Sequence, residues 1–163
     1  MPESNTQTNN NRPDFCGPIE VNCDPRFRVD ISTIQSVIGN ILADAGFQQG
    51  SISVAVVDDP TMHELNRRYL QHDFPTDVLS FVMECDQERH FLDGEIIVSY
   101  DTATTVCQDF NWDANSEFML YIIHGTLHLT GMDDQTPQLR AAMTEAENRY
   151  LKQLGLSRSA PPD

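Results

Sequence analysis

Basic residues are scarce in this chain, and lysine is nearly absent. The 163 residues carry 25 acidic and 10 basic side chains, a formal net charge of −15, and Lys152 is the one lysine. Proteins that bind nucleic acid without sequence preference neutralise phosphates with many lysines and arginines. The composition therefore excludes a broad basic surface for a polyanionic partner. The one adjacent basic pair is Arg67-Arg68.

Long apolar runs and closely spaced cysteine pairs are also missing. No run of eighteen apolar residues occurs, so we expect no membrane span. The N-terminus shows neither the apolar core of a signal peptide nor the arginine-rich pattern of a transit peptide, and we expect a cytoplasmic protein. The four cysteines form no CxxC motif. We expect them to be reduced thiols that bind no zinc.

The chain has no internal repeat and no interior linker rich in Gly, Pro or Ser, which favours one domain. Residues 1–14 are polar and are predicted to be a disordered tail, followed by a single domain over 15–156 and a C-terminal tail over 157–163. Periodicity predicts strands at 19–23, 51–57, 76–83 and 95–100, with Gly94 as a break before the last. Helices are predicted at 31–45, after Asp30 as N-cap, and at 60–69, 101–110, 114–130 and 136–154.

This alternation indicates an α+β fold, an α/β sandwich. In it, about five helices cover a small mixed sheet of about four strands.

The most informative motif is HGTLHLTGMDD at residues 124–134. His124 and His128 are four apart, so on a helix both imidazoles project from one face, about 40° apart. A ligand six residues after His128 would lie about 240° round a continuing helix, on the wrong side. Gly131 permits the left-handed conformation that ends a helix, and the chain can then bring Asp134 back. Three protein ligands with an open fourth position are typical of catalytic zinc, here on a zincin-like helix.

A helical histidine pair by itself is more often two ordinary polar residues than a metal site. Here the pair follows the apolar run FMLYII at 118–123, and buried histidines need partners. Zinc-bound water has a pKa near 7 and can act as a nucleophile or base. A zinc peptidase places glutamate directly after the first histidine as its base, but that position is Gly125. The missing proton acceptor argues against peptide hydrolysis.

Three motifs together resemble one family. HGTLHLTGMDD is similar to the HGxLHLxGyDH signature of the YbeY proteins, which are zinc-dependent endoribonucleases of bacterial ribosomal RNA maturation. LNRRY at 65–69 with PTDVLSF at 75–81 resembles the family's LNxxYR…PTDVLSF, and DGEIIVS at 93–99 resembles its GDIxIS strand. Order and spacing agree, and the resemblance covers roughly residues 19–156. It implies one zinc per chain and single-stranded ribosomal RNA as substrate. It also implies the small ribosomal subunit and its assembly factors as partners.

Two positions depart from the family pattern. The third histidine ligand falls on Asp134, whose carboxylate is an acceptable zinc ligand. A set of two histidines and one carboxylate also suits iron(II), so another divalent metal is open. The family arginine that is thought to hold substrate phosphate falls on Leu70. Arg67 or Arg68 is the replacement candidate for substrate binding, and the catalytic residue beyond the metal-bound water is unknown.

Other polar residues are weaker candidates. Glu117 and Tyr121 precede His124 on its helix and are candidates to orient a ligand. A core tyrosine with a satisfied hydroxyl is the alternative. The segment with Thr76, Asp77 and Ser80 either lines the cleft, with Ser80 contacting substrate, or simply forms a turn after Pro75. Three further histidines are expected at the surface: His63, His72 and His90.

The motif and the resemblance together imply a metal-dependent single-strand endoribonuclease that acts in 16S ribosomal RNA maturation and ribosome quality control. His124, His128 and Asp134 are the predicted metal ligands. Two alternatives stay open. One is a metallopeptidase or other zinc hydrolase, which a base-like carboxylate near His124 would favour. The other is a non-catalytic ribosome assembly factor, which the leucine at position 70 would favour.

Overall fold

The computed structural model describes residues 12–69 and 78–157. Its centre is a four-stranded mixed sheet in the order β1-β2-β4-β3, formed by β1 (Ile19–Cys23), β2 (Gln49–Val57), β3 (Val78–Asp86) and β4 (Phe91–Ser99). β1, β2 and β4 run parallel, and β3 pairs antiparallel with β4. Five α-helices accompany the sheet in this described part of the chain, which confirms the predicted α+β class.

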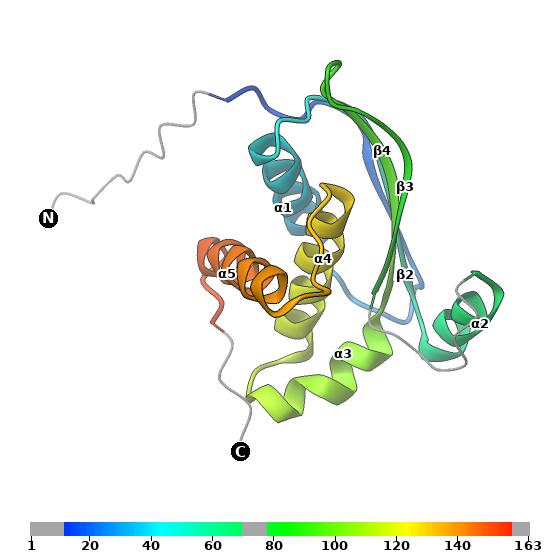
Figure 1. The fold of residues 1–163 in the computed structure, drawn as a ribbon. Helices are drawn as coiled ribbons and strands as arrows, with labels where there is room; N and C mark the ends of the chain where they lie inside the picture. The colour runs from blue at the N-terminus through cyan, green and yellow to red at the C-terminus, as the bar shows by residue number, and fades with distance from the viewer. Residues whose placement is uncertain (1–11, 70–77, 158–163) are drawn as a thin grey trace, which may run out of the picture.

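One face of the sheet carries the main hydrophobic core. In β2, Ile52, Val54 and Val56 are buried while the residues between them are more exposed, which is the period-two pattern of a strand. α1 (Ile31–Asp44), α4 (Ala114–Leu129) and α5 (Pro137–Gln153) all lie on this side of the sheet (Figure 1). The predicted N-cap is confirmed, since the Asp30 carboxylate accepts a hydrogen bond from the Thr33 amide.

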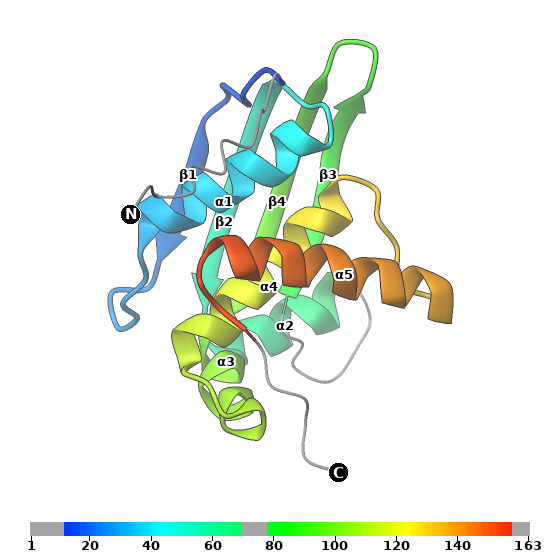
Figure 2. The same cartoon turned by 90° about the vertical axis from the view of Figure 1, so that its left-hand side faces the viewer.

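α4 is the central helix of the molecule. It contacts β3 and β4 on one side and α5 on the other, and α5 lies across it (Figure 2). Its residues from Ser116 to Ile123 are all buried. A helix that is apolar around its whole circumference belongs in a core rather than on a surface. This burial explains why the apolar run before His124 is so long.

α2 (Asp59–Tyr69) lies on the opposite face of the sheet (Figure 1). Its Met62 is fully buried against Leu79 of β3 and Ile97 of β4, a second and smaller hydrophobic cluster. α3 (Tyr100–Val106) follows β4 directly, and a short 3₁₀ helix (Cys107–Phe110) leads on to α4. The sequence predicted one helix over 101–110, but the structure divides it at Cys107.

Gly94 does not break the chain as predicted. β4 begins at Phe91 rather than at residue 95, and Gly94 lies within it, paired with Ile52 of β2. A Cβ atom at Gly94 would come within 2.9 Å of a methyl carbon of Leu129, so a larger residue would force that side chain to shift where α4 crosses the strand. The predicted strand at 76–83 is found as Val78–Asp86, and residues 76 and 77 lie outside the described residues.

Among the residues described, no helix combines the length and apolar character needed to cross a membrane.

Candidate metal centre

The end of α4 places the two histidines and returns the chain toward them. α4 ends at Leu129, and Gly131 follows with φ 101°, in the left-handed region that favours glycine. The Gly131 amide donates to the His128 carbonyl and the Met132 amide to the Leu127 carbonyl. These two bonds form a Schellman motif, the predicted way to end this helix. The reversal brings Asp134 beside the histidine pair.

Three ligand atoms converge at this point. The Nε2 atoms of His124 and His128 are 2.9 Å apart. Asp134 Oδ2 lies 3.6 Å from the first and 3.5 Å from the second. Ligands held at about 2.0–2.1 Å around a tetrahedral ion are about 3.3 Å from one another. The triangle therefore fits the edges of a single metal site.

The three side chains are partly open to solvent, with exposed fractions of 25% for His124, 29% for His128 and 36% for Asp134. A buried structural site would have closed all four positions with protein ligands. Within residues 12–69 and 78–157, this is the one group of three or more His, Cys, Asp or Glu side chains close enough to share a metal ion. The arrangement suits a metal that keeps one position for water or substrate.

The second nitrogen of each histidine also has a partner. His128 Nδ1 is 2.9 Å from the Met132 carbonyl oxygen, which can only accept. The Nδ1 atom must therefore carry the proton, and Nε2 keeps its lone pair for a metal. His124 Nδ1 lies 3.6 Å from Glu147 Oε2, on α5. Oriented imidazoles of this kind are usual for histidine ligands.

Comparison with known proteins identifies the family of this chain. The family model for endoribonuclease YbeY matches residues 22–155. The chain is 42% identical over 113 residues to endoribonuclease YbeY of Rhodopirellula baltica, a match that covers 68% of this chain and 57% of that protein. It is 32% identical over 146 residues to that of Salinibacter ruber, covering 85% of this chain and 93% of the relative. The chain belongs to the endoribonuclease YbeY family.

A solved structure shows the same fold. The solution structure of a Thermotoga maritima protein superposes with a TM-score of 0.59 at 20% identity, and the match covers 84% of this chain and 91% of that one. It supports the α+β architecture. In this YbeY-family chain the match to the Rhodopirellula protein accounts for little more than half of that relative's length, whereas the Salinibacter relative is matched almost throughout.

Glu147 is the site residue that sequence reasoning missed. The inward side of α5 carries the buried residues Met143, Tyr150 and Leu151. Glu147 lies on this same side, and 14% of its side chain is exposed. A carboxylate within the inward stripe of an amphipathic helix is a signal in the sequence. What the sequence could not supply was the neighbour, because α5 meets His124 only through tertiary packing.

Of the two residues on α4 that were predicted to orient a ligand, Glu117 lies away from the metal group, and the role of Tyr121 stays a prediction. Glu117 is two helical turns before His124, about 10 Å along the axis. It is fully buried, and its Oε2 accepts a hydrogen bond from Trp112 Nε1 at 2.7 Å. Tyr121 is also buried. The carboxylate beside the His124 ring is therefore that of Glu147, on a different helix.

The presence of glycine at position 125 has a steric explanation in this YbeY-family fold. A Cβ atom there would lie 2.8 Å from Val78 Cγ2, 3.0 Å from Ser80 Oγ and 3.3 Å from Ile96 Cγ2. The residue after the first histidine thus faces β3 and β4 rather than the metal group. The glutamate that a zinc peptidase carries at this position has no room. Ser80 Oγ donates a 2.8 Å hydrogen bond to the Gly125 carbonyl oxygen, which ties β3 to the metal helix.

The structure does not bring the predicted arginines into the metal group. Arg67 and Arg68 are exposed in the last turn of α2, on the opposite face of the sheet from α4 (Figure 1). Arg68 pairs with Glu64 at 3.4 Å. Substrate binding by Arg67, Arg68 or Ser80 stays a prediction. The remaining candidates, Leu70, His72, Thr76 and Asp77, lie outside the described residues.

The two other histidines lie away from the metal group. His63 on α2 is half-buried rather than at the surface as predicted, because it belongs to the helix that packs on the sheet. His90 is exposed as predicted, in the turn between β3 and β4, where its Nδ1 is 3.0 Å from the Gly46 carbonyl oxygen.

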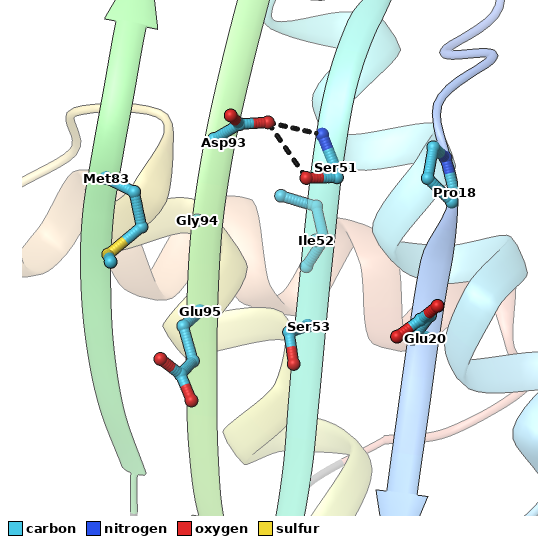
Figure 3. A pocket seen from close by; sticks show the side chains of 9 residues that line it. All are labelled: Pro18, Glu20, Ser51, Ile52, Ser53, Met83, Asp93, Gly94 and Glu95. Atoms are coloured by element: carbon cyan, nitrogen blue, oxygen red, sulfur yellow. Dashed lines mark hydrogen bonds between the residues drawn. The ribbon is translucent and has the colours of Figure 1, made fainter.

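Acidic side chains line a hollow on the other face of the sheet (Figure 3). This cavity of about 380 Å³ includes Glu20, Asp93 and Glu95. The Asp93 carboxylate accepts hydrogen bonds from the amide and hydroxyl of Ser51, at 2.8 and 2.9 Å. Ser51 and Asp93 alternate with the buried residues of their strands, so they point away from α4. These carboxylates make the hollow acidic, so it is not a candidate site for phosphate.

Proposed function

We propose that this chain is a metal-dependent endoribonuclease that cleaves single-stranded RNA in 16S ribosomal RNA maturation and ribosome quality control. Membership of the endoribonuclease YbeY family supports the reaction class. The observation that carries the proposal is the convergence of two imidazole nitrogens and one carboxylate oxygen within 2.9–3.6 Å of one another. His124, His128 and Asp134 hold one ion per chain.

Zinc is the proposed metal. When bound, it supplies Lewis acidity toward a phosphoryl oxygen and lowers the pKa of water to near neutrality. His128 is kept in the ligating tautomer by the Met132 carbonyl. Asp134 adds a negative charge that a third histidine would not bring. Because two histidines and a carboxylate also bind iron(II), metal identity is to be measured on protein purified without added metal.

The peptidase alternative is not favoured by this site. Its usual base cannot occupy position 125, where a side chain would collide with the sheet. Glu147 is a carboxylate near His124, but it lies beside Nδ1, while Nε2 is the nitrogen within the metal group. It therefore faces the side of the ring away from the metal. The remaining alternative, a non-catalytic assembly factor, is decided by whether purified protein cuts RNA.

The proposed partners are the small ribosomal subunit and its assembly factors, and the proposed location is the cytoplasm, where that subunit matures. With a net charge of −15, the chain gains little from nonspecific attraction to RNA. We therefore expect protein contacts to contribute to its association with the ribosome.

The test is cleavage of an end-labelled single-stranded RNA by purified protein, with and without a zinc chelator. A His128→Ala variant prepared identically controls for contaminating nuclease, and His90→Asn is the matched control, since His90 is an exposed histidine in a distant turn. We expect cleavage by the parent and by His90→Asn, and loss of cleavage with chelator or with His128→Ala. Cleavage that persists in His128→Ala contradicts the proposal. Tight subunit binding without cleavage supports the assembly-factor alternative.

A further inference from the structure

Glu147 is a mostly buried carboxylate at the junction of α4 and α5. Its neighbours on α5, Met143, Ala146, Tyr150 and Leu151, are buried, and only 14% of the Glu147 side chain is exposed. A carboxylate in such a place loses hydration and needs a compensating partner. The partner on α4 is His124, whose Nδ1 lies 3.6 Å from Oε2.

The two ring nitrogens of His124 lie toward different groups. Nε2 lies within the ligand triangle, 2.9 Å from His128 Nε2 and 3.6 Å from Asp134 Oδ2. Nδ1 lies toward Glu147. A histidine ligand commonly gives its second N–H to a carboxylate or a carbonyl, which fixes the ring and makes the ligating nitrogen more basic. His128 uses the Met132 carbonyl for this purpose.

We propose that Glu147 is a positioning residue for the metal centre, orienting His124 from α5 and strengthening it as a ligand. The inference rests on the proposed function, because it concerns the same metal group. It assigns α5 a role beyond packing. Whereas His128 is held by the end of its own helix, His124 is held by a second helix, and docking of α5 thereby becomes coupled to metal affinity.

A purely structural ion pair makes the opposite prediction. If Glu147 served only to hold a protonated His124 in the metal-free protein, its removal would free the imidazole. Metal affinity would then rise or stay unchanged. If Glu147 supports His124 as a ligand, its removal weakens metal binding. The sign of the change in affinity separates the two roles.

The experiment measures zinc affinity of metal-stripped protein by competition with a chromophoric chelator. The variants are Glu147→Ala, Glu147→Gln and Glu145→Ala; Glu145 is an exposed glutamate two residues away on the same helix. We expect Glu147→Ala to weaken zinc binding by about 10–100-fold. Glu147→Gln should lose less, since it keeps an acceptor oxygen of nearly the same position beside Nδ1, and Glu145→Ala should match the parent.

Cobalt(II) substitution provides a spectroscopic readout, and we expect the visible bands of the site to change in Glu147→Ala but not in Glu145→Ala. Circular dichroism and thermal melting of the metal-free variants check the fold. If Glu147→Ala does not fold, the near-isosteric Glu147→Gln decides. Affinity equal to or tighter than the parent in a folded Glu147 variant overturns the inference, while zinc binding and RNA cleavage by the parent leave the proposed function intact. A parent that binds no divalent metal ion overturns both.

Discussion

Replacing Gly125 by alanine tests how closely the metal helix is packed against the sheet. In an open helix position, glycine to alanine stabilises a protein by about 1 kcal/mol. At Gly125 the new methyl group would lie 2.8 Å from Val78 Cγ2 and 3.0 Å from Ser80 Oγ, both on β3. Overpacking of this kind costs about 1–3 kcal/mol. The gain in helix propensity and the cost of the contact oppose each other, so Gly125→Ala alone should be neutral or destabilising.

Gly39 provides the matched control within the same molecule. It lies in α1, and a Cβ atom there would meet only Ile19 Cδ1, at 3.9 Å, an ordinary contact. Gly39→Ala should therefore show the propensity gain without the contact cost. Because both variants share that gain, the difference between their unfolding free energies isolates the contact, and we expect about 1–3 kcal/mol.

Urea denaturation of metal-stripped parent, Gly39→Ala and Gly125→Ala measures this difference. Zinc affinity of the two variants adds a functional readout, because a shift of α4 from β3 moves the neighbouring His124. We expect weaker zinc binding in Gly125→Ala and none of that effect in Gly39→Ala. If Gly125→Ala is as stable as Gly39→Ala, the helix is not pressed against the sheet as described. The steric account of the missing peptidase base would then be wrong.

Three further changes have defined outcomes. Asp134→Ala should weaken zinc binding by at least about tenfold in the chelator competition. Asp134→His should retain zinc binding, since both aspartate and histidine side chains can ligate zinc. Equal zinc affinity of Asp134→Ala and the parent would remove Asp134 from the ligand set. Tyr150→Phe should lower the free energy of unfolding in urea by about 1–2 kcal/mol, because the hydroxyl donates a hydrogen bond to the Asp44 carboxylate. Burial, and after it the hydrogen bond to Asp44, raises the pKa of Tyr150 to about 12. The contribution of Tyr150 to the free energy of unfolding is therefore present below pH 10 and is lost as pH rises toward 12. If the loss of stability at alkaline pH is the same in Tyr150→Phe as in the parent, this reasoning is refuted. Hydrogen bonds from Thr61, ahead of the contact with Arg26, lower the pKa of Asp58 to about 2, so its stabilisation is present above pH 4 and is lost as pH falls toward 2. Asp58→Asn should therefore flatten the acid limb of stability, measured by melting temperature from pH 5 to pH 2, and a limb of parental slope would contradict the assignment.

Most of the fold was predictable from local patterns in the sequence. Strand alternation in β2 and the Asp30 cap are local signals, and the structure agrees with both. The convergence of His124, His128 and Asp134 was also predictable, because histidine spacing and Gly131 act within one helix and its end. The residues that were misjudged depend on packing between elements. Gly94 has the sequence signature of a break but lies within β4, where Leu129 of α4 packs closely over it.

The surroundings of the metal group were less predictable for the same reason. Glu147 is thirteen residues beyond Asp134 on another helix, and only the docking of α5 on α4 brings it to His124. The sequence could not show that α2 packs on the far face of the sheet, which separates Arg67 and Arg68 from the metal helix. Helix faces can be read from periodicity, but the partner of each face is decided by the whole core.

The central claim about this protein is that one metal ion at His124, His128 and Asp134 is required for RNA cleavage. The most direct measurement is reconstitution of metal-stripped protein with increasing zinc while cleavage of single-stranded RNA is followed. We predict that activity is absent without zinc and rises to a plateau at one equivalent per chain, and that His128→Ala gains no activity in this range. Cleavage that is independent of zinc, or equal zinc-dependent cleavage by His128→Ala, would contradict the account.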